Sequence, residues 1–440
     1  MHLKWHLQYG RLRTETAAMV LLGLLLLAFR PAAADNSLDR TIEIYQKLLR
    51  IRPHDAELFY RLGDAYIEKG RETGDVTYYS LASQSLKEAL KIEPDLSPAL
   101  RHRAYVLYTL HDFSGASRQA RAAIRLEPND SYSYGVLGDA ELETGKYDEA
   151  ADDYEKMVAL RNNLYSYSRR AGLESIRGNT EAAVADLERA IHDGLDTGKP
   201  REAVAWVRWQ LGNEFFLLGR YAESERQYTD ALLTAPGYYR ALAGLAQVRA
   251  AQGKLEEAAE LYTRAIAVIP FPEYVAALGD VYAKMGRSDE ARKQHELVEF
   301  IGRLNALNKI IYKRVLAYYY ADHDIDHKQA VDLASAELKV RKDVYGFDVM
   351  AWALCRSGKP SEALPYITRA LALGTKDSKL YFHAGMIFLA LRRNAQARIY
   401  LQRALALNAH FQLLLDEVAA REYARLAGKQ KTRYAALNAN

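Results

Sequence analysis

Apolar and polar positions recur along the chain with the spacing of paired amphipathic helices. From Leu137 the chain reads LGDAELETGKYDEAADDYEKMVAL, and related stretches begin at Leu211 and Leu278. A large apolar residue precedes Gly or Ala, a large residue usually stands three positions later, a Gly marks a turn, and an Ala opens a second run. Apolar residues three and four apart give each helix one buried face. The pattern therefore predicts helix-turn-helix units of about 34 residues.

Repetition of this unit predicts about ten helix pairs. Gly or Ala at the eighth position lets two helices approach closely, and the Gly near the fifteenth permits a left-handed turn. One pair cannot bury its apolar face alone, so neighbouring pairs must stack. A leading half-unit runs from Thr41 to Pro53, and the pairs begin near Ala56, Ser97, Ser131, Leu164, Ala205, Tyr239, Pro272, Ile310, Val344 and Ser378.

Two regions depart from the regular pattern. The span from Val298 to Leu316 lacks the usual turn and proline, which predicts a fused or extended helix and a boundary near residue 300 between an array at 35–300 and one at 301–410. The stretch from Phe411 to Leu426 predicts an amphipathic capping helix, and a loose tail is expected from Ala427 to Asn440.

This pattern resembles the tetratricopeptide repeat (TPR), a helix-turn-helix unit. The resemblance implies an all-α fold, a right-handed α-solenoid whose concave side is lined by the first helix of each pair, with a C-terminal capping helix. The block from Tyr318 to Ala390 resembles the closing module of exported bacterial TPR proteins. The positions that carry the resemblance include Leu62, Gly63, Tyr66, Ala82, Leu86, Ala89 and Pro94 in one unit, and Leu211, Gly212, Phe215, Gly219, Tyr221, Tyr228, Ala231 and Pro236 in another.

Composition supports a helical, folded chain without a basic face. The 440 residues are 49% hydrophobic and 26% charged, with 11 prolines. The net charge of +4 falls to about +1 when the first 34 residues are left out. A nucleic-acid partner is therefore not expected. The single cysteine, Cys355, cannot form an internal disulfide, and no His or Asp cluster suggests a catalytic thiol.

The N-terminus has the order of a secretory signal peptide. A positively charged start precedes AAMVLLGLLLLAF, from Ala17 to Phe29, and then small residues that end at Ala34. We expect cleavage after Ala34, hence a signal peptide at 1–34 and a periplasmic or otherwise extracytoplasmic bacterial protein. These 13 residues are fewer than the roughly 20 that span a bilayer. The alternative is an uncleaved inner-membrane anchor; no stable membrane insertion is expected after cleavage.

The TPR resemblance also implies which side chains face the concave groove. The second, fifth and ninth positions of the first helices carry mainly aromatic residues, which offer large contact area at low entropic cost. The alternative is that several of these rings pack between neighbouring helices. The predicted groove residues are Tyr60, Tyr105, Tyr132, Tyr165, Trp206, Trp209, Asn213, Tyr345, Trp352 and Phe382.

Three other features suggest chemistry only weakly. Asp64, Asp139 and Asp280 occupy the ninth position in three units, which disfavours a clamp for a terminal carboxylate and favours a partner with some positive charge. ADHDIDH, at 321–327, holds metal-ligand types, but Asp326 suits the N-cap of the following helix, so a polar turn is expected. GLDTGKP, which ends at Pro200, lacks the spacing of a phosphate loop.

These patterns predict a non-catalytic scaffold that binds a peptide or helix of a partner protein in its concave groove. The alternatives are an accessory subunit of an envelope enzyme or secretion machine, and a solenoid that associates with itself. No enzyme activity, metal or cofactor is expected, and the oligomeric state is open.

Overall fold

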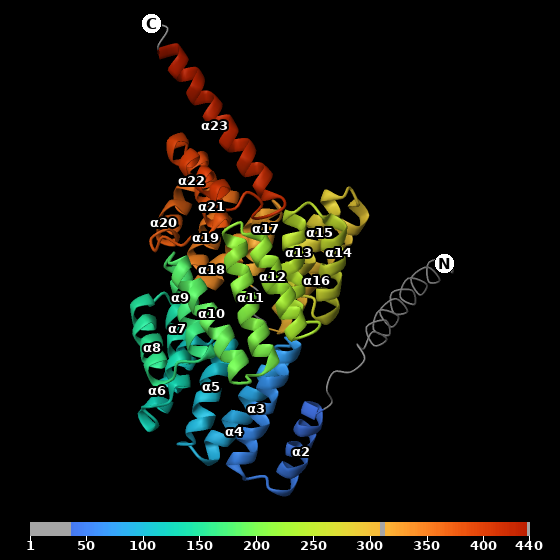
Figure 1. Ribbon diagram of the computed structural model, residues 1–440, viewed down its shortest axis with the longest axis vertical. Helices are drawn as coiled ribbons and strands as arrows, with labels where there is room; N and C mark the ends of the chain where they lie inside the picture. The colour runs from blue at the N-terminus through green and yellow to red at the C-terminus, as the bar shows by residue number, and fades with distance from the viewer. Residues whose placement is uncertain (1–36, 309–312, 438–440) are drawn as a thin grey trace, which may run out of the picture. The chain divides into compact units, whose positions relative to one another are not determined.

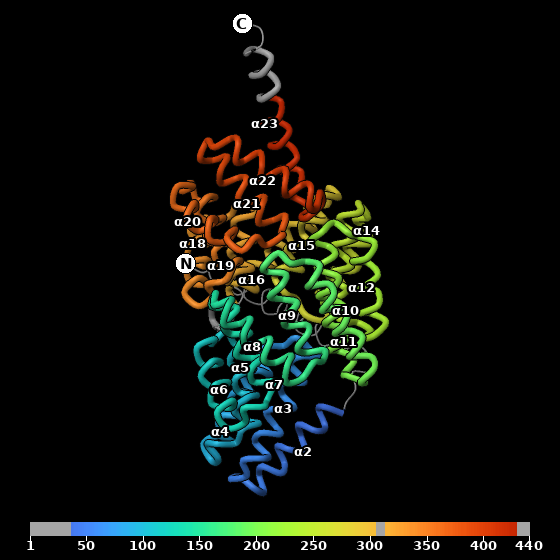
Figure 2. Tube along the Cα trace, turned by 60° about the vertical axis from the view of Figure 1, so that its left-hand side comes forward, coloured from blue at the N-terminus to red at the C-terminus, as the bar shows by residue number. Residues whose placement is uncertain are grey.

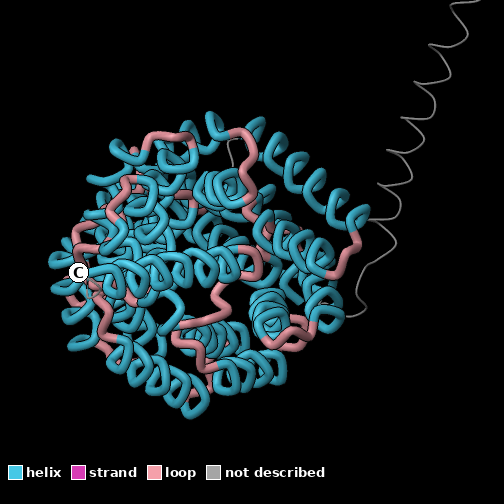
Figure 3. The backbone as a smooth tube through the Cα atoms, turned by 90° about the horizontal axis from the view of Figure 1, so that it is seen from above, coloured by secondary structure: helices cyan, strands magenta, loops and turns pink. Residues whose placement is uncertain are grey.

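Twenty-two α-helices account for all the regular secondary structure of the residues that the structure describes (Figure 3). The computed structural model describes residues 37–308 and 313–437. Contacts divide the chain into two units, the second of which begins at His54. The first unit contains α2 (Ser37–Ile51), the helix predicted as the leading half-unit. The predicted signal peptide lies outside the described residues.

The second unit is a run of ten helix pairs followed by one long helix (Figure 1). We number the pairs as repeats 1 to 10 and call the helices of each pair A and B. The pairs are α3 (Ala56–Thr73) with α4 (Thr77–Ile92), α5 (Ser97–Thr109) with α6 (Phe113–Leu126), α7 (Ser131–Glu143) with α8 (Tyr147–Leu160), α9 (Leu164–Ile176) with α10 (Thr180–Asp196), α11 (Arg201–Leu217) with α12 (Tyr221–Thr234), α13 (Tyr239–Ala251) with α14 (Leu255–Val268), α15 (Pro272–Lys284) with α16 (Ser288–Asn308), α17 (Lys313–Asp322) with α18 (His327–Leu338), α19 (Val344–Arg356) with α20 (Pro360–Ala370), and α21 (Ser378–Ala390) with α22 (Asn394–Leu407).

The predicted α-solenoid of stacked pairs is confirmed. Eight A helices begin at the residue at which the sequence places the start of a pair. Several follow an Asp or Asn whose side chain accepts a backbone N–H of the first turn, as Asp55, Asp130 and Asp377 do. The two other A helices do not begin at the predicted residue. α11 begins at Arg201, directly after Pro200, and the predicted start of α17 falls in 309–312, outside the described residues.

Small residues bring the helices of neighbouring pairs together around large ones. The ring of Tyr228 is fully buried, and a Cβ atom at either Gly212 or Gly244 would lie 2.5 Å from it. The Tyr228 hydroxyl donates to Asn213 Oδ1 at 2.6 Å, so the buried phenol is satisfied. The repeat spacing thus places a glycine from two successive A helices against one tyrosine.

Turns between the A and B helices require the left-handed backbone region. Gly145 and Gly358 have φ of 78° and 80°, values that favour glycine because other residues meet their own Cβ there. Repeats 2 and 10 use His111 and Arg392 instead, with φ of 60° and 59°.

The C-terminal end differs from the sequence expectation. The last helix, α23 (Leu415–Leu437), begins four residues later than Phe411 and continues beyond Leu426. Residues 408–414 form a loop instead, because Phe411 turns into the core and is only 7% exposed. The expected loose tail is helical as far as Leu437, in a stretch rich in the helix formers Ala, Lys, Gln and Arg.

The helix at the predicted irregular region is longer than its counterparts. α16 has 21 residues, whereas the other B helices have between 11 and 17. The predicted division near residue 300 stays a prediction. Among the helices that the structure describes, none is both long and apolar enough to cross a membrane.

A seam closes the superhelix of the second unit (Figure 2). We use this name for the contact of the A–B turns of repeats 3, 4 and 5 with the loops that precede α19, α21 and α23. At its first point, the Lys342 N–H donates to Glu143 O at 3.0 Å, and the Val344 N–H donates to the Tyr147 hydroxyl at 2.9 Å. A Cβ atom at Gly145 would lie 2.4 Å from Lys342 O. Backbone therefore packs against backbone.

The other two points of the seam repeat this arrangement. The Thr375 hydroxyl donates to Ile176 O. Asn408 Nδ2 donates to Phe216 O at 2.6 Å, and the Tyr221 hydroxyl donates to Asn408 Oδ1. Since three consecutive repeats meet three consecutive loops in the same order, the concave side is enclosed over this stretch instead of lying open as a trough.

The seam predicts different costs for two glycine substitutions. Gly358→Ala should lower the free energy of unfolding by about 1 kcal/mol, because φ is left-handed but a Cβ atom meets nothing within 4 Å. Gly145→Ala should cost about 1–3 kcal/mol more, because its Cβ would collide with the backbone of Lys342. Denaturant and thermal unfolding of both variants measure the difference; equal costs would contradict a packed seam.

Candidate binding site in the superhelix interior

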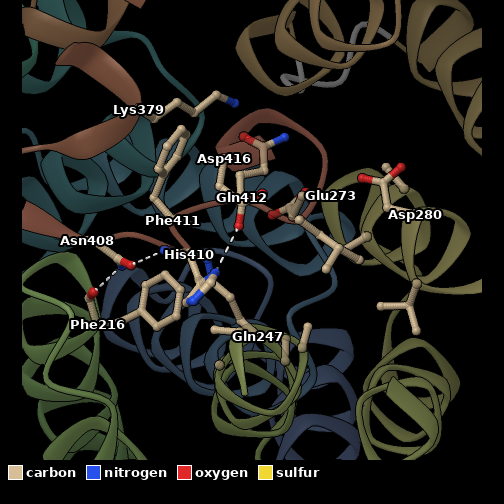
Figure 4. Close-up of a pocket in the computed structure, with 18 of the residues that line it drawn as sticks. Phe216, Gln247, Glu273, Asp280, Lys379, Asn408, His410, Phe411, Gln412 and Asp416 are labelled. Carbon is tan, nitrogen blue, oxygen red and sulfur yellow. Dashed lines mark hydrogen bonds and ion pairs between the residues drawn. The ribbon is translucent and has the colours of Figure 1, made fainter. Parts of the chain in front are cut away.

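The interior contains a cavity of about 1080 Å³ (Figure 4). Its walls are the A helices α11, α13, α15 and α17, the start of α21, the 408–414 loop and the start of α23. We call it the main cavity. Elements from both sides of the seam are needed to form it, so it exists only where the superhelix is closed.

Small side chains on the A helices leave this space. Ala243 and Gly244 on α13, with Ala276 and Ala277 on α15, line the wall. The indole ring of Trp209 also borders the cavity and places an aromatic surface beside these small side chains. Two amides, of Asn213 and Gln247, also line the cavity and supply hydrogen-bonding groups of the kind that fix a ligand's orientation.

The 408–414 loop forms one side of the main cavity. The Phe411 ring packs 5.7 Å from the ring of Phe382, and Gln412 Nε2 donates to Asp322 Oδ2 at 3.3 Å. Figure 4 shows His410, Phe411 and Gln412 around the cavity. Sequence reasoning missed this loop because the apolar pattern of Phe411 continues into that of α23.

Carboxylates outnumber cations around the main cavity. Three Lys or Arg residues face six Asp or Glu residues, with two histidines beside them. The acidic residues are Glu273, Asp280, Asp322, Asp377, Asp416 and Glu417, and the others are Arg240, Lys284, Lys379, His323 and His410. The wall therefore carries negative potential, which favours a cationic ligand.

Several of these carboxylates are already neutralised. Asp322 accepts from Lys379 Nζ at 2.7 Å and from Trp352 Nε1 at 2.8 Å. Burial opposes its charge, but Lys379 and His383 hold the pKa of Asp322 below its ordinary value. His323 Nε2 lies 2.7 Å from Asp280 Oδ1. Burial lowers the pKa of His323, but the bond to Asp280 outweighs this and raises it.

Glu273 differs from these residues. Its side chain stands in the first turn of α15 and is accessible to the cavity (Figure 4). No cation forms an ion pair with its side chain among the described residues, and its carboxylate accepts a hydrogen bond from its own backbone N–H. Desolvation by the surrounding protein raises the pKa of Glu273, and the hydrogen bond from its own backbone N–H and the charge of Arg240 partly offset this effect. A carboxylate in this setting gains from a cationic ligand that supplies the missing partner.

A smaller cavity of about 370 Å³ lies nearer the N-terminal repeats. Arg71, Arg240 and Arg341 line it with one carboxylate, Glu202. Arg71 lies 4.9 Å from the ring centre of Tyr105, and Arg240 borders both cavities. The charge of the interior therefore changes from basic to acidic along the superhelix.

The groove residues predicted from the sequence do not form one continuous surface. Trp209 and Asn213 line the main cavity, and Tyr105 and Trp206 line the smaller one. The others lie elsewhere in the second unit. They are Tyr60, Tyr132, Tyr165, Tyr345, Trp352 and Phe382.

Three of these others are buried by packing. Tyr60, Trp352 and Phe382 are 5%, 2% and 1% exposed. Trp352 stacks on His383 with ring centres 4.5 Å apart, and Phe382 meets the Phe411 ring. Neighbouring elements cover these three side chains. They therefore agree with the alternative prediction that several of the aromatic rings pack between helices and do not face the groove.

The remaining three are half-buried. The Tyr345 hydroxyl donates to Asp377 Oδ2 at 3.4 Å. The Tyr132 ring lies 5.8 Å from the guanidinium of Arg169, and Tyr165 packs against the core formed by α9, α10 and α11. A binding role for the ten groove positions stays a prediction.

Two other sequence features have structural explanations. Asp326 caps α18 by accepting from the Gln329 N–H at 3.0 Å, as expected for a polar turn. Cys355 is half-buried, and burial raises its pKa to about 11 despite Arg356 nearby. The thiol is therefore protonated at neutral pH and is a poor nucleophile.

The stacked helix pairs and the interior that they enclose place this protein in the class of α-solenoids. The sequence profile of the Tetratricopeptide repeat family matches residues 102–164, 209–275 and 349–410. The chain is a tetratricopeptide-repeat protein. In general terms the repeats make it a protein-interaction scaffold.

Known proteins resemble parts of the chain. A TPR repeat-containing protein of Methanocaldococcus jannaschii is 24% identical over 240 residues, which are 49% of this chain and 40% of that protein. Small glutamine-rich tetratricopeptide repeat-containing protein 2 of Saccharomyces cerevisiae is 24% identical over 143 residues, 32% of this chain and 41% of that protein. The chain thus spans about 40% of the length of these curated relatives.

A solved structure resembles the chain in fold. Human IFIT1, solved as a dimer with m7Gppp-AAAA, superposes with a TM-score of 0.50 and 17% identity over 77% of this chain and 76% of that one. At this identity the likeness concerns the helical architecture alone.

The interior also predicts a pH effect on stability. His111 lines the smaller cavity, and burial, with Arg341, Arg314 and Lys313 nearby, lowers its pKa to about 2. An unfolded histidine binds a proton below about pH 6.5, whereas the folded one does not. The contribution of neutral His111 to the free energy of unfolding is therefore fully present above pH 6.5. It is lost as the pH falls, by about 2 kcal/mol at pH 5.

His111→Asn should reduce this loss, because Asn does not titrate and tolerates the left-handed backbone. Unfolding free energies of the wild type and the variant at pH 7 and pH 5 measure the effect. Nearby carboxylates, such as Glu143 with its pKa raised by burial to about 7, remain in both proteins. If both lose the same stability on acidification, His111 does not titrate as described.

Proposed function

We propose that the protein is a non-catalytic scaffold that holds an extended, positively charged segment of a partner protein in the main cavity. The observation that carries this proposal is the excess of carboxylates around the cavity, among them Glu273, which forms no ion pair with a described residue. A Lys or Arg side chain of the partner would neutralise it.

The walls also suit a peptide backbone and its side chains. Asn213 and Gln247 offer amide groups, and Trp209 offers an indole ring beside the small residues of α13. The volume of about 1080 Å³ stands at the upper end of the range of small-molecule sites. Several consecutive side chains therefore fit better than a single compact ligand.

Selection from a random peptide library displayed on phage tests this proposal. Peptides that bind the purified wild type should be enriched in Lys and Arg, and their affinity should fall with ionic strength. Glu273→Gln should weaken a selected peptide at least about threefold, because one ion pair is lost. Trp209→Ala should weaken it about tenfold, because an aromatic contact is lost.

The matched control is Glu260→Gln, which removes the same charge from an exposed position on α14. Glu260→Gln should bind as the wild type does, and all variants should show similar thermal unfolding. Selection of neutral or acidic peptides, or equal losses for Glu260→Gln and Glu273→Gln, would refute the proposed site.

We propose further that the chain is exported. The charged start, the apolar stretch and the small residues that end at Ala34 support this proposal. When the chain is expressed in a bacterium, the intact mass of the protein from the periplasmic fraction should correspond to a chain that begins at Asp35. An uncleaved chain that begins at Met1 and stays with the membrane would support the anchored alternative.

A further inference from the structure

Three metal-ligand side chains meet where repeat 7 packs on repeat 8. Asp280 lies on α15, His295 on α16 and His323 in the turn directly after α17. One ligand atom from each lies within 4.8 Å of the others. His323 belongs to the ADHDIDH stretch, but its partners come from the preceding repeat, so the cluster is not visible as a local motif.

Tyr319 holds both imidazole rings. The backbone oxygen of Tyr319 lies 2.8 Å from His323 Nδ1, and its hydroxyl lies 3.2 Å from His295 Nδ1. His323 Nδ1 donates to the Tyr319 oxygen, and a proton lies between Nε2 and Asp280 Oδ1, 2.7 Å away. A metal ion would take the place of that proton between the imidazole and the carboxylate. Such outer hydrogen bonds fix the tautomer and orientation of histidines that bind metals.

The backbone around the cluster also leaves room for the rings. A Cβ atom at Gly279 would lie 3.1 Å from His295 Cε1, so glycine lets this ring approach α15. Asp280 is 7% exposed, and both histidines are partly buried. Asp280 and His323 also line the main cavity, so the cluster is reached from that side.

We propose that Asp280, His295 and His323 bind a divalent transition-metal ion of the Zn²⁺ type. Two imidazole nitrogens and one carboxylate oxygen suit such an ion, whereas Ca²⁺ and Mg²⁺ prefer oxygen ligands alone. Three protein ligands leave a fourth position for water or for a group that enters the main cavity. The evidence for this site and its test do not depend on the proposed peptide binding, although Asp280 and His323 also line the main cavity.

The ion would join repeats 7 and 8 through α15, α16 and the turn that follows α17. These repeats flank residues 309–312, where the chain passes from the long α16 to α17. A ligand that binds only the folded chain raises its thermal stability with concentration. Metal binding therefore predicts a higher unfolding temperature.

The test uses the purified, untagged full-length chain after removal of metals with a chelator. Zn²⁺ alone is titrated in competition with a chromophoric chelator, and thermal unfolding is followed with and without Zn²⁺. Co²⁺ alone is added to a second sample, in which nitrogen and oxygen ligation gives visible absorption bands. The wild type should bind one ion per chain, unfold at a higher temperature with Zn²⁺ and show the Co²⁺ bands.

Matched variants assign the site. His295→Gln and His323→Gln should each weaken Zn²⁺ binding far more than His327→Gln, which changes the other histidine of the ADHDIDH stretch, at the start of α18. His327 pairs with Asp324 at 3.2 Å and lies outside the cluster. Tyr319→Phe keeps all three ligands but removes one outer hydrogen bond, and should weaken binding about tenfold.

Two results would overturn the proposal. One is a wild type that binds no Zn²⁺ in the competition titration and shows no Co²⁺ bands. The other is equal weakening by His327→Gln and His323→Gln, which would place the ion elsewhere. Metal-free unfolding temperatures show whether each variant folds, and if His323→Gln does not, the comparison of His295→Gln with His327→Gln decides.

Discussion

Backbone groups of loops far apart in the sequence meet at the seam, and the interior of the second unit depends on this contact. Lys342 donates to Glu143 O, and Asn408 donates to Phe216 O. Each helix pair buries its apolar face only against its neighbours, and stacking alone would leave the concave side open. The main cavity has walls from both sides because the rotation accumulated over successive repeats brings the turns of repeats 3 to 5 onto the loops before α19, α21 and α23.

The local part of this architecture could be predicted from the sequence. Gly212 and Tyr228 belong to one spacing pattern, and the eight A helices that begin where expected follow from short-range periodicity and capping. The seam could not be predicted, because a small change in rotation per repeat adds up over several repeats. Lys342 and Thr375 lie in loops, where no periodic pattern identifies them as contacts.

The same limit explains the mixed outcome for the site. Position within the repeat correctly places Trp209 and Asn213 toward the interior. It places Trp352 and Phe382 there too, but Phe411 of the 408–414 loop packs against Phe382, and Trp352 stacks on His383. The cluster around His323 was missed for a similar reason, because its partners become neighbours only when repeat 7 stacks on repeat 8.

The charges of the interior argue for binding over a purely structural role. Burying a carboxylate costs free energy unless a cation or hydrogen-bond donors compensate it. Asp322 has Lys379, and Asp280 has His323, so each adds little net charge. Glu273 is instead exposed to the cavity; it accepts a hydrogen bond from its own backbone N–H, feels the charge of Arg240 and forms no ion pair with a described residue. An alanine or glutamine there would cost the solenoid no ion pair that the described contacts reveal, which supports the proposal that this carboxylate meets a cation from outside the chain.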